Sequence, residues 1–358
     1  MTAAKKYSLT RSTRMPNSYC IYCSPDQPAQ TPYTREHVIP EAFGKFRDNL
    51  VLNEGVCHDC NKFFGEKLEV IFGRGSLEGI LRLDYRIKPP TNLNKLRKDR
   101  VVFSLSTMGD LNGLILECQE ENGELIVALV RQVGFPHVNG NGRIYVSAWD
   151  LANLSLPLPQ EADTTKDVFL IFDTEEVRQQ LIQDLLKRNV KANEVLFEAS
   201  LPMNIGDEIN VATKSKIDDI VLRCISKIAF NYLAKMAGLS FVLRNDFNAT
   251  RSYIRYGIEP GYDFIKISDQ PILASDSKNQ RETQGHLIIV DFPAKGKDVI
   301  AQVSLFNFLT YEFILAKDFS GLWQNIISGH HFSITEMKVT SLQAISSILP
   351  LRIIRKPT

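Results

Sequence analysis

Two short stretches, Cys20-Ile21-Tyr22-Cys23 and Cys57-His58-Asp59-Cys60, decide how the N-terminal part of this sequence is interpreted. Each is a Cys-x-x-Cys pair, and residues 24–56 separate the two. Such a pair holds one metal ion through a tight turn, while the chain between the pairs is free to fold. Thiolates are preferred ligands of Zn²⁺. The spacing therefore predicts a structural zinc site formed by Cys20, Cys23, Cys57 and Cys60.

Two local disulfides or four buried free thiols are the alternatives to this zinc site. Six cysteines in 358 residues are too few for a disulfide scaffold. The N-terminal segment is polar, and nowhere do about 18 apolar residues run together as in a transmembrane helix. We therefore expect a cytoplasmic protein that does not contact membranes, and reducing conditions there disfavour disulfides. The remaining cysteines, Cys118 and Cys224, are expected in the core.

Composition and charge exclude several classes of protein. The length and the 44% hydrophobic content are sufficient for two domains with real cores, and they exclude disordered, collagen-like and coiled-coil chains. The 42 basic residues nearly balance the 41 acidic ones, for a net charge of +1. Nucleic acid would therefore have to be bound by a local basic patch.

Residues suited to catalysis lie between and beside the two cysteine pairs. Glu36-His37-Val38-Ile39-Pro40 comes first, Asn49 begins the run Asn49–Leu52, and Asn61 directly follows Cys60. In this order the sequence resembles the HNH endonuclease family, the ββα-metal nucleases, in the form whose catalytic hairpin is braced by a four-cysteine zinc. The resemblance covers roughly residues 18–70, and it rests on the order of the motifs rather than on any one of them.

The resemblance implies a role for each of these residues. His37 is expected to be the general base that takes a proton from water, Glu36 and Asn61 to hold a catalytic divalent ion, and Asn49 to fix the hairpin loop. An imidazole with an ordinary pKa near 6.5 suits the base, and carboxylate and amide oxygens suit Mg²⁺ or Mn²⁺. The family commonly has Asp where this chain has Glu36, and His58 is a further candidate for a metal role.

The predicted fold class is α+β, with a small zinc-braced ββα-metal HNH domain followed by a larger mixed α+β domain with antiparallel strands. Pro89-Pro90 lies in a segment rich in breakers, which suggests a linker. The predicted parts are an N-terminal tail (1–17), the HNH domain (18–85), a basic linker (86–100) and an accessory domain for substrate, partner or signal recognition (101–358).

Periodicity predicts the elements of the accessory domain. The predicted helices are Thr174–Asn189 and Ile217–Ala237, the second with apolar residues at three- and four-residue spacing. The predicted strands are Val101–Met108, Gly113–Cys118, Glu124–Arg131, Asp167–Phe172, Val195–Ser200, Gly285–Phe292, Val299–Leu305 and Phe308–Ala316.

Two stretches are candidates for binding nucleic acid. From Arg82 to Arg100 there are seven basic residues against two acidic ones, a local charge of +5, which favours phosphate contacts, although a solvated linker is the alternative. Cations and aromatics interleave in Arg251–Tyr256, as they would along a nucleic-acid strand, with an edge strand as the alternative. The predicted phosphate-binding residues are Arg82, Arg86, Lys95, Arg97, Lys98, Arg100, Arg251 and Arg255.

The sequence thus predicts a metal-dependent endonuclease that hydrolyses phosphodiester bonds of nucleic acid, with double-stranded DNA as the expected substrate. The expected cofactors are structural zinc and catalytic magnesium or manganese. A role in antiviral defence or restriction, and a homodimer or a defence-system partner, are further expectations. The alternative is a catalytically silent zinc-knuckle module that binds nucleic acid or protein. Glu36-His37 together with Asn61 favours the enzyme, because a zinc knuckle alone does not require them.

Overall fold

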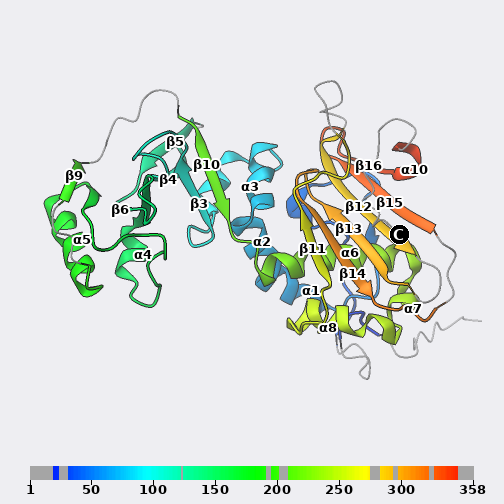
Figure 1. Ribbon diagram of the computed structural model, residues 1–358. Helices are drawn as coiled ribbons and strands as arrows, with labels where there is room; N and C mark the ends of the chain where they lie inside the picture. The colour runs from blue at the N-terminus through cyan, green and yellow to red at the C-terminus, as the bar shows by residue number, and fades with distance from the viewer. Residues whose placement is uncertain are drawn as a thin grey trace, which may run out of the picture. The chain divides into compact units, whose positions relative to one another are not determined.

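Contacts within the chain divide it into two compact units. We analysed a computed structural model of the 358-residue chain. It describes residues 19–23, 31–121, 124–190, 195–200, 209–274, 283–292, 297–321 and 326–345. Unit 1 consists of Met1–Glu69 and Asp219–Thr358, and unit 2 consists of Val70–Asp218. In the sequence, unit 2 is therefore an insertion into unit 1, and the C-terminal part of the chain belongs with the cysteine-rich N-terminal part (Figure 1).

This division differs from the predicted HNH domain (18–85), basic linker (86–100) and accessory domain (101–358). Pro90 begins a 3-10 helix, η3 (Pro90–Lys95), inside unit 2, since proline is compatible with the first turn of a helix. Arg100, expected in the linker, forms a bidentate ion pair with Asp218 of the same unit. The predicted tail, 1–17, lies outside the described residues.

The N-terminal part of unit 1 has the predicted ββα arrangement. Strands β1 (Glu36–His37) and β2 (Val51–Leu52) pair antiparallel, with Glu36 opposite Leu52. A 3-10 helix, η1 (Glu41–Phe43), lies in the loop between them. Helix α1 (His58–Phe63) follows and continues into the π-helical segment η2 (Phe64–Glu69).

The C-terminal part of unit 1 is a long helix packed on an antiparallel sheet. The sheet has six strands in the order β11-β14-β13-β12-β15-β16. Their bounds are β11 Ile265–Ser268, β12 Gly285–Phe292, β13 Val299–Ser304, β14 Thr310–Ala316, β15 Ile326–Ser333 and β16 Lys338–Ser341. The helix, α6 (Asp219–Ala237), crosses this sheet (Figure 1). The shorter helices are α7 (Leu239–Val242), η4 (Asn245–Phe247), α8 (Asn248–Tyr256) and α10 (Leu342–Ile345).

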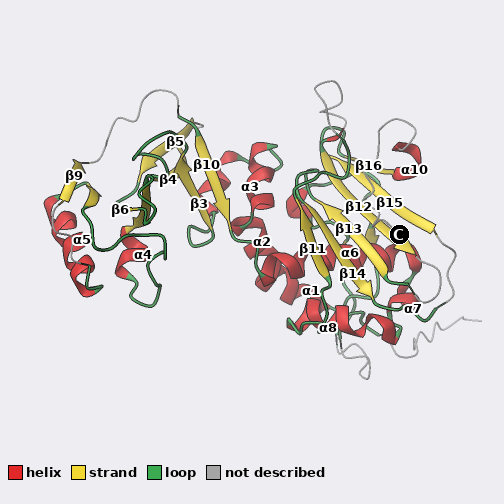
Figure 2. Ribbon diagram, in the orientation of Figure 1, coloured by secondary structure: helices red, strands yellow, loops and turns green. Residues whose placement is uncertain are grey.

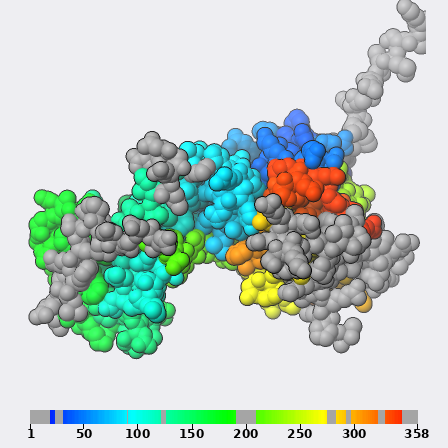
Figure 3. Space-filling model, turned by 90° about the horizontal axis from the view of Figure 1, so that it is seen from above, coloured from blue at the N-terminus to red at the C-terminus, as the bar shows by residue number. Residues whose placement is uncertain are grey.

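Helix α6 forms where apolar residues recur at helical spacing, and from Cys224 to Ala234 every residue is buried. Such all-round burial is typical of a helix at the centre of a core. The helix also contacts η2 and β2, so it lies between the hairpin and the sheet. The two ends of unit 1 meet a second time at Arg47, whose N–H donates to Met337 O at 2.7 Å. In Figure 3 the blue N-terminal segment and the orange-red C-terminal segment lie against each other.

Unit 2 contains two four-stranded sheets, shown in yellow with their helices in red in Figure 2. The first has the order β10-β3-β4-β5 and the second β7-β6-β8-β9, in which only the described pair β8–β9 is parallel. The strands are β3 Val101–Leu105, β4 Ile115–Glu121, β5 Glu124–Leu129, β6 Gln132–Pro136, β7 Arg143–Ser147, β8 Val168–Phe172, β9 Val195–Ser200 and β10 Val211–Ser215. The helices besides η3 are α2 (Val70–Gly75), α3 (Leu77–Asp84), α4 (Ala148–Ala152) and α5 (Glu175–Lys187).

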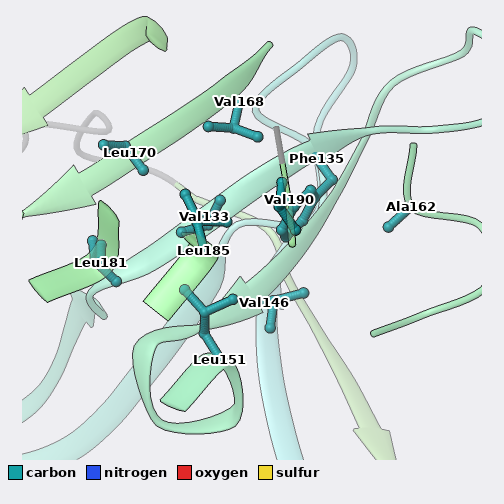
Figure 4. Close-up of a cluster of buried hydrophobic side chains, with 10 residues drawn as sticks. All are labelled: Val133, Phe135, Val146, Leu151, Ala162, Val168, Leu170, Leu181, Leu185 and Val190. Carbon is teal, nitrogen blue, oxygen red and sulfur yellow. The ribbon is translucent and has the colours of Figure 1, made fainter. Parts of the chain in front are cut away.

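Apolar side chains from the second sheet pack with those of α4 and α5 into one core, which includes Val133, Leu151, Leu170 and Leu181 (Figure 4). The predicted mixture of helices and antiparallel strands is therefore confirmed in both units. Within the described part of the chain, no helix combines the length and apolar character needed to cross a membrane.

Candidate metal and nuclease site

The four predicted zinc ligands come together in unit 1. The Sγ atoms of Cys20, Cys23, Cys57 and Cys60 all lie within 4.8 Å of one another. Cys23 Sγ is 3.6 Å from Cys57 Sγ and 3.7 Å from Cys60 Sγ. Tetrahedral zinc with Zn–S bonds of about 2.3 Å requires sulfurs roughly 3.8 Å apart. Both the donor set and the spacing therefore fit a structural Zn²⁺.

Two backbone N–H groups donate hydrogen bonds to one sulfur of the cluster. The N–H groups of Tyr22 and Cys57 both donate to Cys20 Sγ at 3.4 Å, and such bonds stabilise a thiolate. A hydrogen bond from the Cys60 thiol lowers the pKa of Cys20 to about 5, whereas burial raises the pKa of Cys23 to about 12. Zinc binding would require each of the four thiols to lose its proton.

Each ring nitrogen of His37 has a polar side chain beside it. Its Nδ1 lies 3.0 Å from Asn49 Nδ2 across the hairpin loop, and its Nε2 lies 3.2 Å from Glu41 Oε1. The His37 side chain is 17% exposed, so solvent reaches the imidazole. Burial is the main cause that lowers the pKa of His37, and Glu41 acts in the opposite direction. The imidazole is therefore neutral near pH 7, as a general base must be.

Asn49 lies two residues before β2, beside the His37 ring. Its Oδ1 is buried and has no hydrogen-bond partner among the described residues. Rotating the amide by 180° would let Oδ1 accept a hydrogen bond from Nδ1–H of His37. That tautomer leaves the lone pair of His37 on Nε2, where it can take a proton from water but makes no hydrogen bond to the Glu41 carboxylate.

Glu36 lies in the interior of unit 1, with 5% of its surface exposed. Its Oε1 contacts Lys227 Nζ of α6 and accepts a hydrogen bond from Asn231 Nδ2 at 3.0 Å. Lys227 also forms an ion pair with Glu69 Oε1 at 2.7 Å. Burial raises the pKa of Glu36, and the positive charge of Lys227 acts against that shift. The position differs from the expected one, because a ligand of a catalytic ion has to face the reaction site.

Asn61 and His58 lie at the start of α1 in different surroundings. Asn61 Nδ2 donates to Thr34 Oγ1 at 2.9 Å and to Arg35 O at 3.2 Å. These bonds orient the amide, whose carbonyl oxygen Oδ1 is the atom a hard cation would bind. The side chain of His58 is 57% exposed, with its Nδ1 3.5 Å from Asp59 Oδ1.

Three of the residues predicted to bind phosphates are buried and have protein partners. Arg82 Nε donates to Gly79 O at 3.2 Å, and Arg251 donates from a terminal nitrogen to Val242 O at 2.8 Å. Arg100 is committed to Asp218. Burial lowers the pKa of Arg82 and of Arg251. Their guanidinium groups therefore have structural roles, which the local charge of the sequence did not reveal.

The exposed cations of the same set differ in their partners. Arg97 pairs with Asp99 at 2.8 Å, and Lys98 pairs with Glu117, so acidic neighbours offset much of the predicted local charge. Arg86 and Lys95 are exposed on unit 2. Arg255 belongs to unit 1 and is half-buried, with its guanidinium carbon 3.9 Å from the ring centroid of Phe63 in α1.

The sequence interpretation missed three residues that contact the predicted site. Glu41 follows His37 by only four residues. The sequence does not show, however, that the loop between them brings the carboxylate back to the imidazole. Lys227 and Asn231 have a clearer signal, because each interrupts the apolar pattern of the predicted helix Ile217–Ala237. A lysine at a core position calls for a buried acidic partner, but the sequence does not say which acid that is.

Comparison with known proteins covers the N-terminal part of the chain. Residues 20–76 match the model of a family described as HNH endonuclease. Searches of curated proteins and of solved structures gave no match. The matched segment contains the four clustered cysteines, the hairpin β1–β2 and the helix α1. Residues 20–76 are therefore similar to HNH endonucleases, and the four clustered cysteines lie within or at the edge of this segment.

Proposed function

We propose that unit 1 is a zinc-braced, divalent-metal-dependent endonuclease in which His37 is the general base. The observation that carries the proposal is the position of the His37 imidazole, which lies between the side chains of Asn49 and Glu41 on the hairpin of a ββα fold. Hydrolysis of a phosphodiester needs a base for water and a cation at the phosphate oxygens. A neutral, solvent-accessible imidazole beside oxygen ligands fits both needs.

The protein groups that would hold the catalytic ion are the oxygen donors of Asn61 in α1 and of Glu41 beside His37. Asn61 offers its amide oxygen, and Glu41 offers a carboxylate that is 48% exposed. We prefer Glu41 to Glu36 as the acidic ligand, because Glu36 is enclosed by Lys227 and Asn231. Oxygen donors select Mg²⁺ or Mn²⁺, which would supply charge stabilisation at the phosphate, and the thiolates select Zn²⁺.

Double-stranded DNA is the substrate that we propose. The support is the HNH match together with exposed cations that can meet phosphates, namely Arg86, Lys95, Arg97 and Lys98. A function in antiviral defence or restriction, with a homodimer or a defence-system partner, is part of the same proposal. It rests on the resemblance of the HNH region to such nucleases.

Cleavage of supercoiled plasmid tests the proposal directly. The purified protein is incubated with plasmid in Mg²⁺, in Mn²⁺ or with a chelator, beside His37→Ala and the control His58→Ala, whose side chain is exposed. We expect cleavage that needs the divalent ion and falls about 10²–10⁴-fold in His37→Ala, with zinc content and fold retained. His58→Ala should cleave as the wild type does.

Two results would count against this function. Near-normal turnover in His37→Ala would remove His37 from the mechanism. Binding of DNA without cleavage in any of the ions would favour the alternative, a silent zinc module.

A further inference from the structure

A buried ion-pair cluster joins α6 to the catalytic hairpin. Lys227 is 1% exposed, and its ammonium contacts the carboxylates of Glu36 in β1 and Glu69 in η2. The ring of Phe64 lies 5.3 Å from the same ammonium. A buried ammonium is costly unless charged partners compensate it. Lys227 therefore fixes the places of both acids relative to α6.

Asn231 extends this cluster by one helical turn. Its Nδ2 donates to Glu36 Oε1 at 3.0 Å and to the backbone oxygen of His37 at 3.4 Å. Its Oδ1 accepts a hydrogen bond from the hydroxyl of Tyr22 at 2.6 Å. Tyr22 lies between two of the clustered cysteines. One asparagine on α6 thus contacts β1 and the metal-binding turn together.

The hairpin needs support of this kind. Each of its strands has two residues, and an isolated two-stranded hairpin is at best marginally stable in water. Successive side chains of a strand point to opposite faces. When Glu36 is held on the inner face of the strand, the next side chain, His37, has to point to the outer face. The contacts of Glu36 therefore determine the direction of the His37 side chain.

We propose that Lys227 and Asn231 are positioning residues that hold β1 through Glu36 and thereby fix the imidazole of His37 for catalysis. Glu36 is then a structural anchor of the hairpin rather than a ligand of the catalytic ion. This inference rests on the proposed nuclease function, and it assigns part of the site to a helix outside the HNH region.

Variants of α6 and β1 test the assignment in the full-length protein. The set is Lys227→Met, the conservative Lys227→Arg, Tyr22→Phe, Glu36→Gln, and the control Lys235→Met, which removes an exposed charge from the same helix. For each variant, kcat and KM for plasmid, the half-saturating Mg²⁺ concentration and the zinc content are measured. The ring signals of His37 are followed by NMR.

We expect Lys227→Met to lower kcat by about 10- to 100-fold, with KM and the Mg²⁺ requirement unchanged and the His37 signals shifted. Lys227→Arg should recover part of kcat, and Tyr22→Phe should show a smaller loss of the same kind. Glu36→Gln should need no more Mg²⁺ than the wild type. Lys235→Met should match the wild type throughout.

Three results would overturn the inference. The first is a wild-type kcat with unshifted His37 signals in folded Lys227→Met, and the second is a raised Mg²⁺ requirement in Glu36→Gln, as for a lost ligand. If Lys227→Met does not fold, Tyr22→Phe gives the third, through unchanged kcat and His37 signals. A wild type that cleaves no substrate would contradict the proposed function alone, and the NMR comparison would still decide the positioning role.

Discussion

Two glutamates near His37 show how position decides the role of one residue type. Glu36 precedes His37 on β1, so it faces inward and is 5% exposed. Glu41 follows in the loop, where its carboxylate is half exposed and 3.2 Å from the imidazole. The sequence motif favoured Glu36 as the ligand of the catalytic ion. The burial of Glu36 and the exposure of Glu41 instead support our proposal that Glu41 is the ligand.

Removing the charge of Glu41 should change the titration of His37. Burial lowers the pKa of His37, while Glu41 raises it. In Glu41→Gln the pKa of His37 should therefore fall further. An NMR titration of the His37 ring from pH 4.5 to 8 without divalent ion, so that no bound cation compensates the Glu41 charge, tests this. Glu54→Gln, an exposed change shortly after β2, is the control, and an unmoved titration in Glu41→Gln would separate Glu41 from His37.

Loss of one zinc ligand should lower stability as well as activity. Cys57 belongs to the sulfur cluster and occupies the N-cap position of α1, and the binding energy of a structural zinc is folding energy. We expect Cys57→Ser to lose zinc and to melt at a clearly lower temperature, while Cys118→Ser, outside the cluster, keeps its zinc. Elemental analysis and thermal melts measure both effects. A full zinc content in Cys57→Ser would contradict the assignment.

At the scale of elements, sequence periodicity predicted helices and strands whose apolar pattern lies within one continuous segment. The predicted strand Gly285–Phe292 is confirmed as β12 with the same bounds, and the predicted helix Ile217–Ala237 is confirmed as α6 from Asp219. Arg251–Tyr256, which offered either a nucleic-acid strand contact or an edge strand, is instead part of the helix α8. Arg251 and Tyr253 are both buried where this helix packs on the rest of the protein. The alternation of cations and aromatics is therefore explained by packing.

The candidate site was predictable to the extent that it lies in one stretch of sequence. The four cysteines meet as predicted, and His37 lies beside Asn49 in the loop. What the sequence could not show were contacts over long separations, since Lys227 reaches Glu36 from a distant helix. Local patterns carry no information about which distant charge compensates a buried one.

Two glycines in the HNH region should respond oppositely to alanine. Gly55 has φ +93°, and a Cβ there would lie 2.5 Å from Leu239 Cδ2. Gly65 is helical and nothing lies within 4 Å of its Cβ position. Gly55→Ala should therefore destabilise the protein by more than about 1 kcal/mol, and Gly65→Ala should stabilise it by about 0.4–1 kcal/mol. Urea unfolding measures both free energies, and equal effects would show that the turn at Gly55 tolerates a side chain.

At the scale of the whole molecule, unit 1 is held together by contacts between the two ends of the chain. His286 of β12 is one of them, because its Nε2 lies 2.9 Å from Phe43 O and its Nδ1 accepts from Phe306 N–H at 3.1 Å. The ring is completely buried. Like the cluster around Lys227, this contact joins the C-terminal sheet to the hairpin loop.

His286 should make the protein less stable in acid. Burial lowers its pKa to about 4, and nearby His331 acts in the same direction. The unfolded imidazole titrates near 6.5, so between about pH 6.5 and 4 the unfolded state binds more protons and stability falls as pH falls. His286→Gln should reduce the loss of unfolding free energy between pH 7 and pH 5 by about 2 kcal/mol. Urea unfolding at both values tests this, and an unchanged loss in His286→Gln would show that another group is responsible.

The insertion of unit 2 into unit 1 predicts which fragments fold. Residues 1–100 contain the whole HNH match but lack α6, so Glu36 and Glu69 would lose Lys227. Breaking such a buried pair costs about 3–5 kcal/mol, a large part of the 5–15 kcal/mol that stabilises a typical domain. Fragment 1–100 should therefore not fold cooperatively.

The complementary deletion should preserve the fold of unit 1. Removing residues 70–218 and joining Glu69 to Asp219 by a Gly/Ser linker of about 20 residues, which spans about 25 Å on average, retains every residue of unit 1. It should melt cooperatively and retain zinc, because α6 still supplies Lys227 and Asn231 to the hairpin. Circular dichroism melts measure the cooperativity of unfolding of fragment 1–100 and of the deletion protein, and elemental analysis measures their zinc content. Cooperative folding of 1–100 with full zinc would mean that the HNH region is independent of α6.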